Sequence, residues 1–359
     1  MVFYIKSSTE SEQLLKISIR NAWPTMSKKP PDMRRLVEVA RLYYESGLTQ
    51  AEIARILHVS RPGVQRMVQA AREQGIVRIS ISDPLDLAGT LGKELQAAFG
   101  LERVIIVPSV PGDRQATKAR VGEAGARYLE TVLGKDMTLA VAWGTTVHEV
   151  AKALRAARLA GLRVVQMVGE LGLGSEPSET FRAIADHLGG QAIALPAPAM
   201  EKNPAVRRSI RLSSHVQEVF RILRDANIAL TGIGPVSEEA TIVKRGHVTE
   251  SVMRRLAQEG AAGEMNTKFF DTQGRPLEAF NDQIIGMALE GIRRIPHVIA
   301  VVSNSPGKVP AVLGALRGRY LNVLITDEAL ASQVIAAQAA EEGKRNRSRG
   351  GRRNPTRRP

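Results

Sequence analysis

Cysteine is absent from the 359 residues of this chain. The chain therefore has no disulfide bond, no thiolate metal site and no cysteine nucleophile, and we expect a reducing, cytoplasmic compartment. No uninterrupted apolar run approaches the roughly 18 residues that a membrane-spanning helix needs. Residues 1–16 do not place a basic segment before an apolar one, so no secretory signal is expected. These absences exclude a membrane protein, a secreted disulfide scaffold and a zinc ribbon.

The sequence also lacks the short motifs of common enzyme classes. It contains no GxSxG nucleophile elbow and no HExxH zinc motif, and Gly307-Lys308 is followed by Val309 rather than by the Ser or Thr of a phosphate-binding loop. None of the six histidines stands four residues from another: His58, His148, His187, His215, His247 and His297. We interpret them as surface or core residues and predict no catalytic residue, metal site or cofactor.

Positive charge is concentrated near the two ends of the chain. The net charge is +14, of which residues 33–82 carry +4 and residues 341–359 carry +6. The long stretch from 83 to 340 is almost neutral at +2. A basic segment beside a neutral body indicates a partner that is a polyanion, and we expect it to meet the basic ends.

The length predicts two domains, at about 150 residues for each. We expect a small domain at 33–82, a linker at 83–90 and a large domain at 91–340. Residues 1–32 show no periodicity, so they are either a disordered leader or an over-extended gene start before Met33. Residues 341–359 have almost no apolar side chain to bury and are predicted to be a disordered basic tail. That tail either aids solubility or contacts phosphates without specificity.

The large domain alternates short β-branched runs with amphipathic stretches. The expected strands are 103–107, 139–143, 163–168, 228–231, 297–302 and 322–326, and the expected helices include 116–133 and 147–157. Alternation of strand and helix predicts a largely parallel sheet that is covered on both faces, which is a doubly wound α/β domain.

The small domain has the pattern of three short helices. The first carries an apolar stripe and stops at Gly47, and the second begins with the capping-box spacing of Thr49 and Glu52. His58-Val59 is expected to form the next turn, and residues 64–71 supply the buried stripe of a third helix. Pro62 leaves two residues, Ser60 and Arg61, as candidates for the cap of that helix.

The outward face of the third helix carries arginine and glutamine. Arginine pairs with guanine, glutamine pairs with adenine, and further arginines hold phosphates, so this face suits the major groove of DNA. A helix-turn-helix is therefore predicted, and residues 75–79 are expected to form the short strand of a wing. The candidate DNA-binding residues are Thr49, Gln50, Ser60, Arg61, Gln65, Arg66, Gln69 and Arg72.

Three loops of small residues follow strands of the large domain. Gly144-Thr145-Thr146 follows the second expected strand, Gly232-Ile233-Gly234 follows the fourth, and 303–308 follows the fifth and ends in Lys308. Small residues let backbone N–H groups approach an anion, and a helix N-terminus adds favourable partial charge. Together with the lysine, these loops predict a site for a small phosphorylated ligand.

From about residue 33 to 338 the chain resembles the SorC family of bacterial sugar-responsive transcription regulators, which are relatives of the DeoR type. The resemblance rests on the helix-turn-helix and on segments in a characteristic order: LERVIIVP, AWGTTVHEVAKAL, VVQMVGELG, LPAP, IALTGIG, GAAGEMNTKFFDTQG and ALRGRYLNVLITDEALA. It implies an effector domain similar in fold to ribose-5-phosphate isomerase and glucosamine-6-phosphate deaminase, which binds a sugar phosphate without converting it. The pocket residues it implies are Gly144, Thr145, Thr146, Gly232, Gly234, Glu264 and Lys308.

The sequence departs from that family's usual pattern at several pocket positions. Thr145 stands where the family has Arg, Glu264 stands where it has Asp, and residues 303–306 replace its paired glycines. The segment 175–179 also lacks the family's usual Asn. A phosphate site is retained in Lys308 and Thr146, whereas the sugar it selects, and whether that sugar is phosphorylated, stay open.

These observations predict a regulator of a carbohydrate operon whose operator binding responds to a sugar phosphate. The expected partners are double-stranded operator DNA, the phosphorylated sugar and further copies of the chain as a dimer or tetramer, with no membrane. The alternatives are an isomerase-like or deaminase-like enzyme and a domain that only assembles oligomers. Asp327-Glu328 is the one candidate acid/base pair, and a helix-capping role for the aspartate is preferred.

Overall fold

The computed structural model describes residues 32–74, 76–77, 87–170, 176–244, 246 and 248–350. The chain separates into two compact units, Met1–Ser82 and Asp83–Pro359, which are treated in turn. The division falls at the start of the linker expected at 83–90. The leader at 1–31 and most of the wing strand at 75–79 lie outside the described residues.

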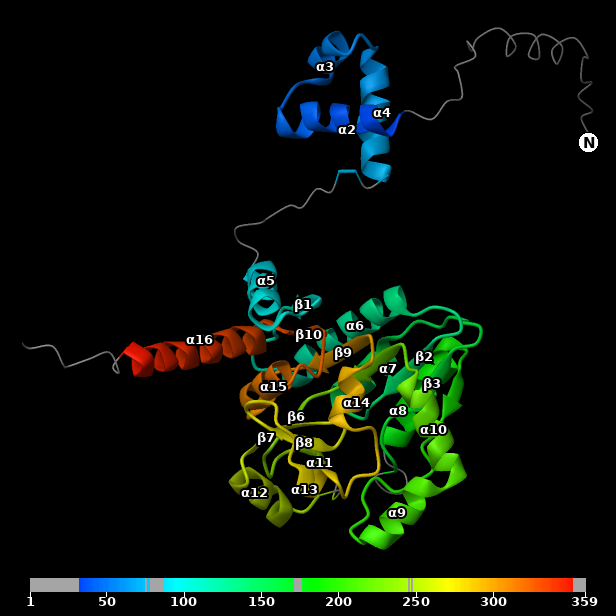
Figure 1. The fold of residues 1–359 in the computed structure, drawn as a ribbon, viewed down its shortest axis with the longest axis vertical. Coiled ribbons are helices and arrows are strands. Elements are labelled where there is room, and N and C mark those ends of the chain that lie inside the picture. Colours follow the sequence, from blue (N-terminus) through cyan, green and yellow to red (C-terminus); the bar gives the residue numbers. More distant parts are fainter. Residues whose placement is uncertain are drawn as a thin grey trace, which may run out of the picture. The chain divides into compact units, whose positions relative to one another are not determined.

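The first unit is a three-helix bundle, as the sequence predicts (Figure 1). Its elements are α2 (Met33–Ala40), the π-helical turn η1 (Arg41–Glu45), α3 (Gln50–Ile56) and α4 (Arg61–Glu73). Residues at helical spacing meet in one small core: Val39, Ile53, Val64 and Val68. A π-helical turn is rare in proteins and widens the end of the first helix before Gly47, whose φ of 68° ends it.

Two polar caps fix the starts of α3 and α4. The Thr49 Oγ1 accepts a hydrogen bond from the Glu52 backbone N–H at 3.3 Å, and the Glu52 carboxylate accepts one from the Thr49 N–H at 2.8 Å, so the capping box is confirmed. Hydrogen bonds from the Thr49 hydroxyl and from the Thr49 backbone N–H to the Glu52 carboxylate lower the pKa of Glu52. Ser60 Oγ accepts from Gly63 N at 3.2 Å, which makes Ser60 the cap of α4 and Arg61 its first residue.

The second unit is built on a seven-stranded parallel sheet in the order β1-β10-β9-β5-β2-β3-β4. Its strands are β1 (Arg103–Val107), β2 (Thr138–Val141), β3 (Arg163–Gln166), β4 (Gln191–Ile193), β5 (Ile228–Thr231), β9 (His297–Val302) and β10 (Val323–Asp327). The six expected strands are present, with ends shifted by up to two residues, and β4 is an addition.

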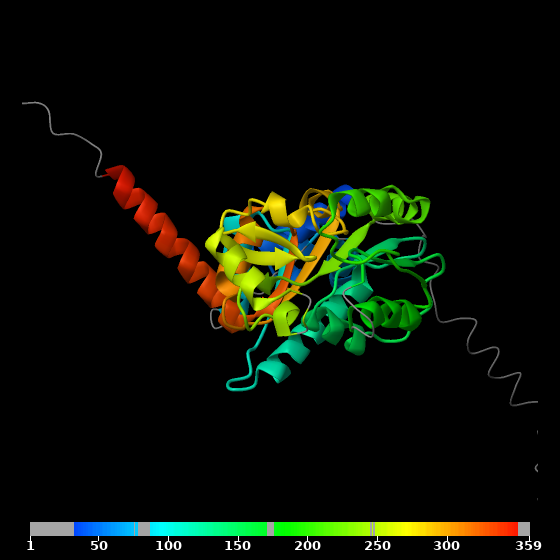
Figure 2. The ribbon, with the colours of Figure 1, turned by 90° about the horizontal axis from the view of Figure 1, so that it is seen from below.

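Helices cover both faces of this sheet, so the doubly wound α/β prediction is confirmed (Figures 1 and 2). The helices of the unit are α5 (Leu87–Phe99), α6 (Arg114–Val132), α7 (Thr145–Ala153), α8 (Glu176–Leu188), α9 (Pro204–Leu212), α10 (Ser214–Arg224), α11 (Thr241–Lys244), α12 (Glu250–Gln258), α13 (Glu278–Asn281), α14 (Leu289–Arg293), α15 (Lys308–Arg317) and α16 (Glu328–Gly350). None of the helices in the described part of the chain is both long and apolar enough to cross a membrane.

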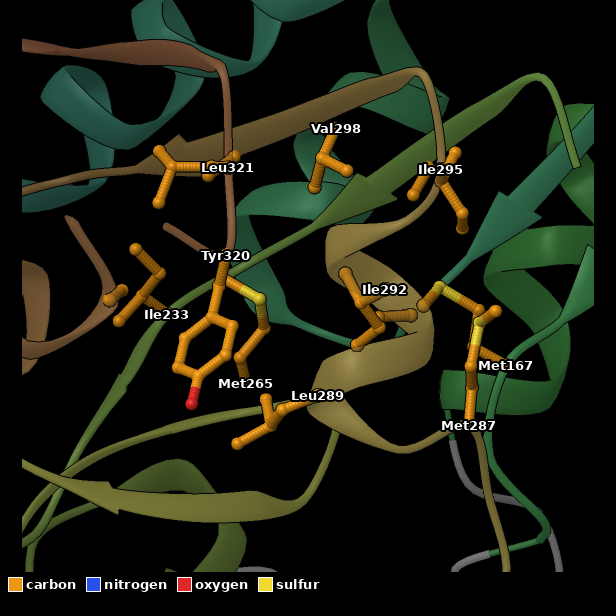
Figure 3. Packing of buried hydrophobic residues seen from close by; sticks show 14 of the residues in the cluster. Met167, Ile233, Met265, Met287, Leu289, Ile292, Ile295, Val298, Tyr320 and Leu321 are labelled. Carbon is orange, nitrogen blue, oxygen red and sulfur yellow. The ribbon is translucent and has the colours of Figure 1, made fainter. Parts of the chain in front are cut away.

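Alternate residues of each central strand enter two separate hydrophobic clusters. Ala140 and Ala300 join the cluster that includes side chains of α5, α10 and α14, whereas Val141 and Val301 join the one that includes α6, α7 and α8. Figure 3 shows the first cluster, where Ile292 of α14 lies among side chains from segments far apart in the sequence. Two cores on opposite faces hold the strand ends rigidly in place.

A small antiparallel sheet, absent from the sequence-based expectation, lies beside α15. It contains β6 (Gly234–Pro235), β7 (Ala261–Met265) and β8 (Lys268–Asp271). Gly263 of β7 packs so closely against α15 that a Cβ there would lie 2.7 Å from the Ala311 Cα. This close packing places β7, and with it Glu264, next to the start of α15.

Two expected boundaries are wrong. The linker predicted at 83–90 is too long, because α5 already begins at Leu87. The disordered tail predicted at 341–359 is wrong for residues 341–350, because α16 runs on to Gly350, while residues 351–359 lie outside the description. Contacts with α15 hold the start of this extension, since Arg317 Nη2 donates to Gln338 Oε1 at 2.7 Å and to Glu341 Oε2 at 2.8 Å.

Arg317 is therefore expected to anchor α16. We expect Arg317→Ala to lower the free energy of unfolding by about 1–3 kcal/mol, because Glu341 and the Thr272 carbonyl lose their guanidinium partner. Urea unfolding followed by circular dichroism measures this change. Arg293→Ala, which removes an exposed guanidinium, is the control and should change stability by less than about 0.5 kcal/mol. An equal effect of the two variants would contradict the anchoring role.

Candidate DNA-binding face and effector pocket

The outward face of α4 carries the five predicted side chains of that helix, and all of them are exposed: Arg61, Gln65, Arg66, Gln69 and Arg72. Two turns of the face are held by internal hydrogen bonds. Gln69 Nε2 donates to Glu73 Oε1 at 2.9 Å, and Arg66 Nε donates to the Pro62 carbonyl at 3.3 Å. These bonds hold the Arg66 and Gln69 side chains along the exposed surface of the helix.

The other three predicted DNA-binding residues stand at helix starts. Gln50 opens α3 and is half-buried. Thr49 and Ser60 are exposed but serve as caps, and the Thr49 hydroxyl is fully engaged because it also donates to Glu52 Oε2 at 2.7 Å. Ser60 Oγ accepts from Gly63 and keeps its O–H available. Of the two, Ser60 is therefore the better donor to a phosphate.

A hollow of about 720 Å³ joins part of this face to the first helix. Gln50, Gln65, Gln69 and Arg72 line it together, whereas Arg61 and Arg66 do not. Tyr43 and Tyr44 of η1 also line it, with ring centroids 4.9 Å apart in an edge-to-face arrangement. The sequence places Tyr43 on the buried stripe and gives Tyr44 no role. The signal in the sequence was a large aromatic residue off the apolar stripe, and the structure leaves Tyr44 38% exposed.

In the second unit, all seven predicted effector residues line one small cavity of about 50 Å³. They arrive from different segments because β9, β5 and β2 are adjacent in the sheet and their carboxyl ends meet at one edge. The loop after β2 brings Gly144, Thr145 and Thr146, the loop after β5 brings Gly232 and Gly234, and the turn after β9 brings Lys308. Glu264 enters from β7.

Two helix N-termini at this cavity are capped by glycine. Gly144 precedes α7 and Gly307 precedes α15, and neither cap provides a side-chain hydrogen bond to the first turn. Helices of this length leave their first backbone N–H groups without a partner inside the helix, and they carry a partial positive charge there. The cavity therefore combines two donor-rich helix ends, which suit a bound anion.

Glu264 and Lys308 are the two ionisable groups of the cavity. Burial raises the pKa of Glu264 to about 7, against the opposing effects of a hydrogen bond from Thr267 N at 3.0 Å and of the Lys308 charge. Desolvation likewise lowers the pKa of the half-buried Lys308 to about 8, which the charge of Glu264 opposes. The Lys308 Nζ donates to the Ile233 carbonyl. Near neutral pH the site therefore holds an ammonium beside a carboxyl that is close to half protonated.

Gly234 allows Glu264 to reach this position. A Cβ at residue 234 would lie 2.1 Å from the Glu264 Oε1, so every other side chain would displace the carboxylate. Trp143, which the sequence-based analysis does not assign, borders the cavity and donates from its Nε1 to Thr267 Oγ1 at 2.9 Å. Its place in the loop after β2, next to Gly144, was the signal in the sequence that could have identified it as a residue of the cavity.

A wider cavity of about 620 Å³ shares Lys308 and is bordered by the loops after β1 and β9, by the end of β10 and by the start of α16. Asp327 is buried at its edge and joins these loops. One carboxylate oxygen accepts from Ser109 Oγ at 2.9 Å and from Leu330 N at 3.2 Å, and the other accepts from Asn304 N at 2.7 Å. The bond from Leu330 confirms the predicted helix-capping role of Asp327.

Comparisons with known proteins find relatives for both units. A family model for a sugar-binding domain matches residues 83–336, and a model of the MarR family matches residues 40–86. The deoxyribonucleoside regulator of Bacillus subtilis (strain 168) is 33% identical over 304 residues, which span 83% of this chain and 96% of that protein. The sorbitol operon regulator of Klebsiella pneumoniae is 26% identical over 312 residues, which span 85% of this chain and 98% of that protein.

A solved structure also matches along most of the chain. The crystal structure of the full-length sorbitol operon regulator SorC from Klebsiella pneumoniae aligns with a TM-score of 0.64 and 25% identity, over 85% of this chain and 100% of that one. The family model covers well over half of the chain, and the relatives extend across both units. The chain belongs to the SorC-type family of sugar-binding transcriptional regulators.

Proposed function

We propose that this regulator binds operator DNA through the outward face of α4 and that a sugar phosphate in the small cavity modulates this binding. The observation that carries the proposal is the meeting of Gly144, Gly234, Glu264 and Lys308 in one cavity. A volume of about 50 Å³ suits one compact group such as a phosphate. The rest of the ligand would extend into the wider cavity on the other side of Lys308.

DNA binding is proposed to require more than one copy of the chain. One recognition helix reads only a few base pairs, so helix-turn-helix proteins commonly bind as dimers on two half-sites. A ligand that binds one arrangement of the copies more tightly than another shifts the population and thereby the occupancy of the operator. The operon is expected to serve carbohydrate metabolism, in keeping with the names of the sorbitol and deoxyribonucleoside regulators.

The ligand class is tested by thermal-shift screening of the full chain. The panel contains pentose and hexose phosphates, their unphosphorylated parents and a deoxyribonucleoside. We expect the phosphorylated compounds to raise the melting temperature, because they bind only the folded protein. Stabilisation by the unphosphorylated compounds alone would show that the cavity takes a neutral sugar.

Lys308 is expected to supply the charge that holds the phosphate. Lys308→Ala should weaken binding of the active sugar phosphate by about 100-fold or more, since a charge-assisted contact in a half-buried site is lost. Isothermal titration calorimetry measures the affinity, and a gel-shift titration should show unchanged operator binding without ligand. Lys152→Ala on α7, an exposed lysine, is the matched control and should bind normally. A Lys308 variant that still responds to the ligand would show that the phosphate binds elsewhere.

The affinity should also fall as pH rises above neutrality. Glu264 loses its proton as pH rises through about 7 and then repels an anion, and Lys308 loses its charge as pH rises through about 8. A phosphate monoester, with a second pKa near 6, remains a dianion throughout. We expect at least about a tenfold loss of affinity between pH 7 and 9. Glu264→Gln should abolish the loss of affinity near pH 7 and keep the loss near pH 8. A wild-type affinity that does not change with pH would contradict the roles assigned to Glu264 and Lys308.

The α4 face is tested by single alanine substitutions. Gln65→Ala and Arg66→Ala should each weaken specific operator binding by about 1–3 kcal/mol if they contact bases. Gel-shift titrations at fixed salt on the chain's own promoter and on a scrambled duplex measure the effect. Arg127→Ala on α6 removes the same charge from the other unit and is the control. Equal losses on both duplexes would assign these residues to phosphate contact instead.

A further inference from the structure

Lys268 of β8 is a buried lysine that contacts backbone carbonyls instead of an acidic side chain. It is only 5% exposed, and its Nζ donates to the Asn281 carbonyl at 2.5 Å and to the Ile284 carbonyl at 3.0 Å. Among the described residues, no carboxylate oxygen lies within 4 Å of this nitrogen. Lysines are rarely buried unless they are paired. An ammonium has three N–H donors, so one of them remains for a further acceptor.

A second cation lies beside this lysine. Arg211 Nη2 is 3.1 Å from the same Ile284 carbonyl oxygen, so two positive charges meet at one acceptor. Arg211 also pairs with Asp282, and so does the buried Arg207. The described residues thus offer this cluster of three cations one carboxylate within 4 Å, which leaves an excess of positive charge. Burial, and after it the Arg211 charge, lower the pKa of Lys268 to about 8 against the opposing effect of the acidic residues nearby.

Lys268 and Arg211 both line a cavity of about 670 Å³, which is also bordered by α10, α14 and the segment 276–288. Among the described residues, it shares no lining residue with the proposed sugar-phosphate cavity or with the wider cavity beside that site. Met287 and Leu289 line it and belong to the hydrophobic core that Figure 3 shows. Apolar walls with a few converging polar groups are typical of a small-molecule site.

The other charges at this cavity decide which anion it suits. Four exposed charges of both signs stand at its edge and nearly cancel, and water screens them: Arg224, Arg294, Glu278 and Glu290. The buried ammonium acts over a shorter range and in a lower dielectric, so it sets the sign of the preferred ligand. Three carboxylates in the lining, that of Asp282 included, disfavour a dianion such as a phosphate monoester.

We propose that this cavity binds a small organic acid, whose single carboxylate accepts a hydrogen bond from Lys268 Nζ and whose apolar part contacts Phe220 and Leu289. The carboxylate completes the ion pair that the buried lysine lacks and offsets the desolvation of the ammonium. This second site lies apart from the proposed sugar-phosphate site and does not depend on that function.

Ligand-observed NMR titrations of the full chain test the site with three probes: phenylacetate, its neutral amide phenylacetamide, and acetate. We expect phenylacetate to bind and the other two to bind at least about tenfold more weakly, because the amide lacks the charge and acetate lacks the apolar part. Equal affinities for phenylacetate and its amide, or no binding of phenylacetate, would overturn the proposal.

Lys268→Met removes the ammonium, keeps an apolar chain of similar length, and should weaken phenylacetate binding at least about tenfold. Lys202→Met, at an exposed lysine outside the lining, is the matched control and should bind normally. Lys308→Ala should also bind phenylacetate normally, so that failure of this site is distinguishable from failure of the sugar-phosphate site. Wild-type affinity in Lys268→Met would rule out the lysine as the anchor.

A second variant tests the cavity without removing any contact of Lys268. Ala288 is exposed and lines the cavity, so the indole of Ala288→Trp should occupy the space and block phenylacetate while the melting curve stays like that of the wild type. Ala257→Trp, at an exposed residue of α12 outside the lining, is the control. Unchanged phenylacetate affinity in a folded Ala288→Trp would show that the acid binds elsewhere.

Discussion

The effector unit depends on the desolvation of two ionisable side chains where three neighbouring strands end. Glu264 is buried and Lys308 is half-buried, and desolvation shifts the pKa of each group in the direction that favours its neutral form. The protein retains this unfavourable arrangement because the parallel sheet, with a hydrophobic core on each face, keeps the strand ends fixed. A bound anion would favour the charged form of Lys308 and offset its desolvation, in keeping with the proposed phosphate site.

The pocket is built before any ligand arrives. The segment that carries Lys308 is held on one side by Asp327, which accepts from the Asn304 N–H, and on the other by α15, whose last residue Arg317 contacts Glu341 of α16. The backbone next to Glu264 is equally constrained, because Gly263 packs directly on Ala311. Preorganisation of this kind reduces the entropy that a small ligand must lose on binding.

The sequence predicts the parts of the fold in which local pattern and tertiary role coincide. The strands of β-branched residues and the glycine loops after β2 and β5 are of this kind. Glu264 was placed in the pocket only by the family resemblance, since the AAGEM strand that carries it has neither alternation nor β-branched residues. The helix beyond residue 340 depends on the contact between Arg317 and Glu341. The π-helical turn that exposes Tyr44 depends on the backbone register at the end of the first helix. Composition alone predicts neither of these two features.

The need to discriminate between DNA sequences gives the proposed self-association its importance. One α4 face offers only a few side chains to the bases, and each wrong base pair costs about 1–3 kcal/mol. A single helix-turn-helix therefore discriminates weakly among the many competing sites of a genome. Two helix-turn-helix units at a fixed spacing double the number of base pairs that are read. Residues 83–340 carry a net charge of only +2 and therefore add little non-specific attraction to DNA. Under the proposed self-association, the contribution of this unit to recognition comes through the contacts that hold two copies together, and a ligand can alter that arrangement.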